Sequence, residues 1–229
     1  MAGTQSARMI RSGIVPIDEL YQGLRPGSTY VLTGGAGAGK TVCSLQFLHQ
    51  GVGTGETVLM VTHASRDDLL ASADRLNVTL RAALREERAV VLRYRPDFSR
   101  RVVRAGTTER VLDEIRKLVQ QYRPRRLVID TVGPLLEDGT PSPVAASALA
   151  ELIATSQATT LLTYPDDLAA NYDRRIEPVV QSATGVFRLL RDPTGKRSVE
   201  AIALRHPPSP SIATDGTSVR RLVERVEVR

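Results

Sequence analysis

One eight-residue stretch of the chain combines small residues with a single lysine and a hydroxyl group. Residues 34–41 read GGAGAGKT, so that Gly34, Gly39, Lys40 and Thr41 satisfy the spacing G-x-x-x-x-G-K-[ST]. Glycines let a backbone wrap closely around phosphates and point its N–H groups inward, and the start of a following helix adds partial positive charge. We therefore expect a phosphate-binding loop at this position.

The side chains of this loop have distinct expected roles. Lys40 would reach the β- and γ-phosphates of a nucleotide as a compact point charge, and Thr41 would offer its hydroxyl to Mg²⁺. The planar fork of arginine would not replace Lys40 well, which explains a lysine here in a chain whose other lysines are Lys117 and Lys196 alone. The expected nucleotide-binding residues are Gly34, Gly35, Ala36, Gly37, Ala38, Gly39, Lys40, Thr41 and Val42.

A phosphate loop needs an acidic partner for its metal ion, normally at the end of another core strand. The apolar run RLVID, residues 126–130, ends in Asp130. An apolar strand that ends in aspartate is a weak signal alone, because many buried strands end in this way. Beside the loop, it predicts that Asp130 and Thr41 hold Mg²⁺ together.

The chain around these residues alternates short apolar, β-branched runs with longer segments of helical period. This pattern predicts an α/β fold with a mostly parallel central sheet flanked by helices. Expected strands cover residues 29–33, 57–62, 89–94, 126–130 and 159–163, and expected helices cover 40–51, 66–76, 107–122 and 144–156. From about Gly185, two alternating runs around a turn with Asp192, Pro193 and Gly195 predict an antiparallel hairpin, and the last segment is expected to add an edge strand or a tail.

Length and composition indicate one ordinary globular domain. The 229 residues are 41% hydrophobic and 24% charged, which predicts a single domain over residues 1–229, with residues 1–10 as a flexible N-terminus. No apolar stretch approaches the roughly 20 residues that span a bilayer, and the first dozen residues lack the apolar core of a signal peptide, so we expect a cytoplasmic protein. Cys43 is the only cysteine, which excludes an internal disulfide and favours a packing role.

The order of the motifs resembles the KaiC-like branch of the RecA-superfamily ATPases. The segment RSGIVPIDELYQGLRPGSTYVLTGGAGAGKT, from Arg11, is similar to the opening of that family, and RRLVIDTVGPLL is similar to its Asp-ending strand. The resemblance extends to about Arg205. It implies a RecA-like P-loop NTPase core, ATP as the ligand, and a homo-oligomer, commonly a hexamer, with nucleotide at the subunit interfaces.

The sequence departs from this family where the catalytic glutamates are expected. The family places two glutamates just after the second strand, where one carboxylate activates the attacking water. Here the strand is followed by HASRDD, with Ala64 and Ser65 near those positions. Asp67 and Asp68 are candidate relocated bases, and Glu56 is a weaker one. Because Ser65 and Asp68 also have the spacing of a helix capping box, we favour capping.

A second departure lies in the last strand of the hairpin. The family often carries K-x-R there to touch the γ-phosphate of the neighbouring subunit, and this chain has Ala203, Leu204 and Arg205. Losing a base and one cation should weaken transition-state stabilisation more than ground-state binding. We therefore expect a slow or inactive ATPase that acts as a nucleotide-dependent oligomeric switch or scaffold for a protein partner. The alternative is an active ATPase with a relocated carboxylate.

Nucleic-acid binding in the manner of recombinases is a third hypothesis. The net charge is +6, and residues 93–104 read RYRPDFSRRVVR. This segment sets Arg93, Arg95, Arg100, Arg101 and Arg104 around the aromatic residues Tyr94 and Phe98. Such a segment can contact phosphates and stack on bases. We favour a solvated loop, because the segments after Asp130 and Thr163 carry acidic residues that would repel a phosphate backbone.

Overall fold

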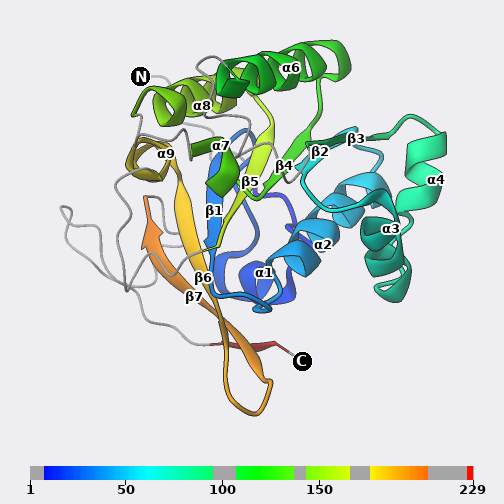
Figure 1. Cartoon of the computed structure of the whole chain (residues 1–229). Helices are drawn as coiled ribbons and strands as arrows, with labels where there is room; N and C mark the ends of the chain where they lie inside the picture. Colours follow the sequence, from blue (N-terminus) through cyan, green and yellow to red (C-terminus); the bar gives the residue numbers. More distant parts are fainter. Residues whose placement is uncertain (1–7, 95–106, 137–142, 166–175, 206–225, 229) are drawn as a thin grey trace, which may run out of the picture.

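A computed structural model describes residues 8–94, 107–136, 143–165, 176–205 and 226–228. Within them, eight strands form one sheet with the order β3-β2-β4-β5-β1-β6-β7-β8 (Figure 1). The strands are β1 (Thr29–Thr33), β2 (Val58–Thr62), β3 (Ala89–Arg93), β4 (Arg126–Asp130), β5 (Thr159–Tyr164), β6 (Gly185–Arg191), β7 (Arg197–Leu204) and β8 (Val226–Val228).

The sheet is parallel from β3 to β6 and antiparallel from β6 to β8. Every residue of β1, β2, β4 and β5 is buried, as expected for strands that are covered on both faces. The predicted mostly parallel sheet with a C-terminal antiparallel hairpin is thus confirmed. For the final segment we expected either an edge strand or a tail. The structure shows an edge strand, β8, paired with β7.

Helices cover both faces of the sheet. They are α1 (Val15–Tyr21), α2 (Lys40–Gly53), α3 (Arg66–Arg75), α4 (Leu80–Arg85), α6 (Thr107–Tyr122), α7 (Gly133–Leu136), α8 (Pro143–Ser156) and α9 (Glu177–Ser182). Figure 1 shows α6 and α8 on one side of the sheet and α1 and α2 on the other. Accordingly, Tyr30 and Leu32 pack in one core cluster and Val31 packs in the other, because successive residues of a strand face opposite ways.

Helix α6 shows how the sequence pattern fixes an element. Leu112, Ile115 and Val119 recur on one side of the helix and are buried against the sheet. The helix ends at Tyr122, where Arg123 adopts a left-handed conformation (φ 42°) and Pro124 follows, which matches the predicted stop. In the described residues, each helix is too short or too polar to cross a membrane.

Candidate nucleotide-binding site

The glycine-rich loop connects the carboxyl end of β1 to the first residue of α2. Three of its glycines, Gly34, Gly37 and Gly39, have φ values of 147°, 73° and 109°, which residues with a side chain rarely adopt. At Gly34 the neighbouring hairpin is also too close for a side chain, because an added Cβ atom would lie 2.5 Å from the carbonyl oxygen of Leu189. Both the backbone conformation and this close packing therefore require glycine at the start of the loop.

Lys40 folds its side chain back over this loop. Its Nζ atom donates hydrogen bonds to the carbonyl oxygens of Gly34 (2.7 Å) and Gly35 (2.9 Å). The first turn of α2 carries no acidic residue, and its N-cap is Gly39, which offers no capping side chain. The positive end of the helix dipole and the open N–H groups of the first turn are therefore directed at the loop together with the lysine ammonium group.

Asp130 lies at the carboxyl end of β4, which is separated from β1 by β5 alone. Its side chain is 4% exposed, and its Oδ1 atom accepts a hydrogen bond of 2.5 Å from the hydroxyl of Thr163 on β5. The peptide bond from Asp130 to Thr131 is cis. The hydrogen bond from Thr163 holds the carboxylate in position at the same edge of the sheet as the loop.

Cys43, the fourth residue of α2, lies within the electrostatic influence of two charged residues near the site. Burial raises the pKa of its thiol to about 12, while the positive charge of Arg197 opposes that rise and the negative charge of Asp130 adds to it. The thiol therefore stays neutral at ordinary pH, in line with the predicted packing role. Asp130 and Arg197 both act electrostatically on the start of α2.

A cavity of about 660 Å³ adjoins the loop at Ala38 and Gly39. Its walls come from α1, α2, the end of α3 and the β6–β7 hairpin. Among its lining residues are Val15, Val42, Leu76, Leu189, Arg197 and Gln46. Apolar side chains share this lining with the polar side chains of Glu19, Gln46 and Arg197, so that a ligand in the cavity would meet both kinds of group.

Arg197 is a site residue that sequence reasoning missed. Its Nε atom lies 3.6 Å from the point that a Cβ atom of Gly39 would occupy, and that nitrogen is buried without a hydrogen-bond partner among the described residues. The signal was present in the sequence, since the hairpin turn near Gly195 brings the first residue of the next strand back toward the end of β6. Pairing of β6 with β1 then carries Arg197 to the loop.

The two candidate carboxylates after β2 lie at the start of α3. Ser65 is the N-cap of that helix: its Oγ atom accepts a hydrogen bond from the Asp68 amide (3.0 Å) and donates one to the Asp68 carboxylate (2.5 Å). The capping interpretation is therefore confirmed. Asp67 is exposed, and after the stronger effect of Asp74 its charge helps to raise the pKa of Arg81, which lies in α4.

Glu56 is far from the loop in the fold. It precedes β2, at the amino edge of the sheet, and forms an ion pair with Arg126 at the start of β4. Arg126 is 1% exposed, donates to the Phe47 carbonyl oxygen (3.0 Å) and lies over the Phe47 ring. Glu56 thus has a structural partner at the opposite edge, and the structure excludes it as a base at this loop.

Arg205 also lies away from the loop of its own chain. It follows the end of β7, where its amide donates to the carbonyl oxygen of Thr184, just before β6 begins. Because β6 is parallel to β1, this end of the hairpin lies at the amino edge of the sheet, whereas Arg197 lies at the carboxyl edge. Any contact of Arg205 with a nucleotide would therefore require a second copy of the chain.

The basic segment is described only at its start. Arg93 is exposed, but Tyr94 is 5% exposed and its hydroxyl donates to the carbonyl oxygen of Thr131 (2.6 Å). Tyr94 is therefore a core residue and offers no free face for a base. The other residues of the predicted patch, Arg95, Phe98, Arg100, Arg101 and Arg104, lie outside the described residues.

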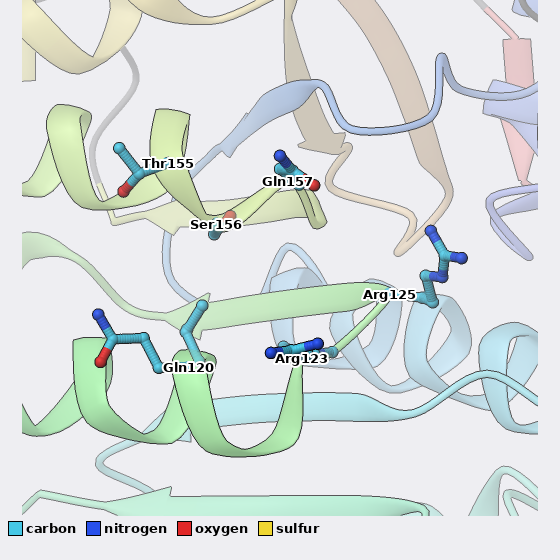
Figure 2. Close-up of a pocket in the computed structure, with 8 residues that line it drawn as sticks. Gln120, Arg123, Arg125, Thr155, Ser156 and Gln157 are labelled. Atoms are coloured by element: carbon cyan, nitrogen blue, oxygen red, sulfur yellow. The ribbon is translucent and has the colours of Figure 1, made fainter.

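A second cavity, of about 600 Å³, lies where α6 and α8 end. Figure 2 shows that the side chains of Arg123 and Arg125 point in different directions there. The hydroxyls of Thr155 and Ser156 donate to carbonyl oxygens of their own helix. These groups do not converge on one point, in contrast to those of the loop.

The parallel sheet, the loop between β1 and α2, and the aspartate at the end of β4 define a RecA-like P-loop nucleotide-binding protein. A family model described as "ATPase: KaiC" matches residues 10–206, and the chain belongs to this family.

Curated relatives agree with this assignment. The circadian clock oscillator protein KaiC of Synechococcus elongatus is 27% identical over 69% of this chain and 32% of its own length. The protein of the same name from Parasynechococcus marenigrum is 27% identical over 85% of this chain and 40% of its own length. The chain thus spans about a third to two fifths of these relatives. A crystal structure of a KaiC-like protein from Pyrococcus horikoshii OT3 superposes with a TM-score of 0.75 at 23% identity, covering 96% of this chain and 94% of that one, which supports the same fold.

Proposed function

We propose that this protein binds Mg-ATP at residues 34–42 as a slow or inactive ATPase, and that the bound nucleotide controls its assembly with copies of itself. The observation that carries the proposal is the Lys40 ammonium group held inside a complete phosphate loop, next to a β2 end that lacks glutamates. The loop can supply ground-state binding, whereas the β2 end supplies no base for the attacking water.

Each part of the site has a task in this proposal. The loop amides and the start of α2 receive the phosphates, and Lys40 exchanges its two carbonyl partners for β- and γ-phosphate oxygens. Thr41 and Asp130 hold Mg²⁺, which neutralises charge on the phosphates when bound. The cavity beside Gly39 accepts the base, and the Arg197 guanidinium lies between that cavity and the loop.

We expect slow turnover because the two residues near the positions of the expected glutamates, Ala64 and Ser65, offer no carboxylate. Ala64 has no polar side chain, and the hydroxyl of Ser65 is used by the Asp68 amide and carboxylate. An attacking water would therefore lack an oriented acceptor for its proton, and general-base catalysis typically contributes about 10²- to 10⁴-fold to a rate. The location of Arg205 at the far edge supports a site that is completed by a neighbouring subunit.

One experiment on purified protein tests the proposal. Binding of a fluorescent ATP analogue, phosphate release and mass by light scattering are measured on the same sample with and without Mg-ATP. We expect wild type to bind and to assemble with nucleotide while its turnover stays far below the ~10 s⁻¹ of a median enzyme. Lys40→Ala should lose binding and assembly. Brisk turnover that Lys40→Ala abolishes would instead favour the active ATPase, and Asp67→Asn would then test the relocated base.

A further inference from the structure

Two arginines face each other across the β6–β7 hairpin at the end that touches the phosphate loop. Arg191 is the last residue of β6, Arg197 is the first of β7, and the two are direct partners in the strand register. Like charges that lie directly opposite on neighbouring strands repel each other. The electrostatic repulsion within this pair therefore destabilises the hairpin in the absence of a ligand.

The carboxylates of the hairpin do not offset this repulsion. Asp192, at the turn, accepts hydrogen bonds from the Thr194 hydroxyl and the Lys196 amide, and the former chiefly lowers the pKa of its carboxyl group. Glu200 forms its ion pair with Arg188. Neither Arg191 nor Arg197 has an acidic partner among the described residues.

Arg191 lies against the loop itself. Its Nη1 atom is 3.7 Å from the point that a Cβ atom of Gly37 would occupy, and its Nη2 atom is 3.7 Å from the corresponding point at Gly195. The guanidinium thus lies between the loop and the turn of the hairpin, and its side chain is exposed. It can turn toward the mouth of the loop without displacing packed groups.

We propose that Arg191 binds the terminal phosphate of the nucleoside triphosphate from within the same chain. This inference rests on the proposed nucleotide binding and adds a cation that comes from the chain's own hairpin. A phosphate group beside Arg191 would relieve its repulsion with Arg197 and accept charge-assisted hydrogen bonds from the planar fork. Ala203, where the resemblance leads us to expect a lysine from the neighbouring subunit, leaves one cation fewer at that phosphate.

The variant Arg191→Gln tests the contact with two readouts of opposite sign. Affinity for a non-hydrolysable ATP analogue should fall roughly tenfold or more, which is the size expected for a hydrogen bond to a charged group, while affinity for ADP changes less than about twofold. In the protein without nucleotide, the melting temperature should stay equal or rise, because the cross-strand repulsion is removed. A residue with only a structural role would instead lower the melting temperature and weaken both nucleotides alike.

The matched control is Lys196→Gln, which removes the same charge from the same turn and should leave the ratio of ATP to ADP affinity unchanged. An equal loss in Lys196→Gln would show a general charge effect and overturn the contact. If wild type binds ATP and Arg191→Gln binds it equally well, the role of Arg191 is overturned and the proposed function is not affected. Wild-type protein that binds neither nucleotide would overturn the proposed function, and the role of Arg191 with it.

Discussion

Asp130 has one oxygen committed within the protein and one available to a ligand. Its Oδ1 atom accepts the Thr163 hydroxyl, and among the described residues no hydrogen bond to the other oxygen is found. The carboxylate is nearly buried, so that its orientation is set by the ends of β4 and β5. A metal ligand benefits from such a fixed orientation, because a partner in the surrounding shell holds it in place.

We predict that Asp130→Asn weakens ATP binding about tenfold or more when Mg²⁺ is present and has little effect in EDTA, because a neutral amide holds the metal ion less well. Titration of a fluorescent ATP analogue under the two conditions measures the difference. An equal loss of affinity in EDTA would show that Asp130 supports the fold of the loop and does not act through the metal ion.

Arg126 and Glu56 are charged residues that stabilise the fold, whereas Asp130 is positioned to bind a ligand. Arg126 is buried against the face of the Phe47 ring, and it forms its ion pair with Glu56 at the amino edge of the sheet. We predict that Arg126→Met or Glu56→Gln lowers the free energy of unfolding, by about 3–5 kcal/mol where a buried charge is left unpaired. Urea unfolding measures this loss. Phosphate release per bound nucleotide should not change, and a selective loss of turnover in Glu56→Gln would contradict the structural role.

At the scale of elements, the loop and the β6–β7 hairpin depend on each other. Gly34 packs against the Leu189 carbonyl oxygen with φ 147°, while a Cβ atom at Gly35 would meet nothing within 4 Å. The hairpin therefore packs directly against the start of the loop. Of the two adjacent glycines, only Gly34 is required by its backbone conformation and by this contact.

We predict that Gly34→Ala abolishes measurable ATP binding, because its methyl group would push the loop away from β6. Gly35→Ala is the matched control and should bind ATP within a fewfold of wild type, since its φ is not in the left-handed region. Affinity titrations of both variants, with circular dichroism to confirm folding, make the comparison. Similar losses in the two variants would show that general loop flexibility matters more than contact with the hairpin.

The sequence predicted the strands and long helices because their patterns are local. The buried runs of β1, β2, β4 and β5 have the apolar content that a doubly covered strand requires, and α6 has a clear apolar stripe. Short helices such as α4 and α9 were missed, because six residues give too little periodicity to detect.

The candidate site was predictable to the extent that it follows a sequence motif. The loop and Asp130 each lie at the end of a recognisable strand, and both appear at one edge of the sheet. Arg191 and Arg197 were not found, because the local hairpin turn only brings the two arginines together, and their proximity to the loop depends on the pairing of β6 with β1, which joins residues distant in the sequence. The ion pair of Glu56 with Arg126 likewise joins residues 70 positions apart.

At the scale of the whole molecule, the two edges of the sheet carry different charged residues. The carboxyl edge holds the loop and Asp130, and the amino edge holds Arg126 and the backbone contact of Arg205 with Thr184. A ring of identical subunits would place one edge of each copy against the next, which is how a heterologous interface closes on itself.

We predict that Arg205→Ala binds ATP with nearly wild-type affinity as a monomer but fails to assemble with Mg-ATP, because it lacks the cation that a neighbouring site requires. Light scattering measures the assembly. Mixing Arg205→Ala with Lys40→Ala should restore some assembly, since each intact loop can then meet an intact Arg205. Wild-type assembly by Arg205→Ala alone would contradict a role in trans.

The β6–β7 hairpin connects these two edges, with a register shift between Val186 and Phe187. Its strands pair from Gly185 with Leu204 to Arg191 with Arg197, so that one end touches the loop and the other leads directly to Arg205. If a phosphate draws Arg191 inward as we propose, the paired strands from Phe187 to Arg191 would move with it, because the ladder of hydrogen bonds holds them together. In a ring, such a hairpin would couple the presence of a terminal phosphate at one nucleotide site to the contact that Arg205 makes with the next site.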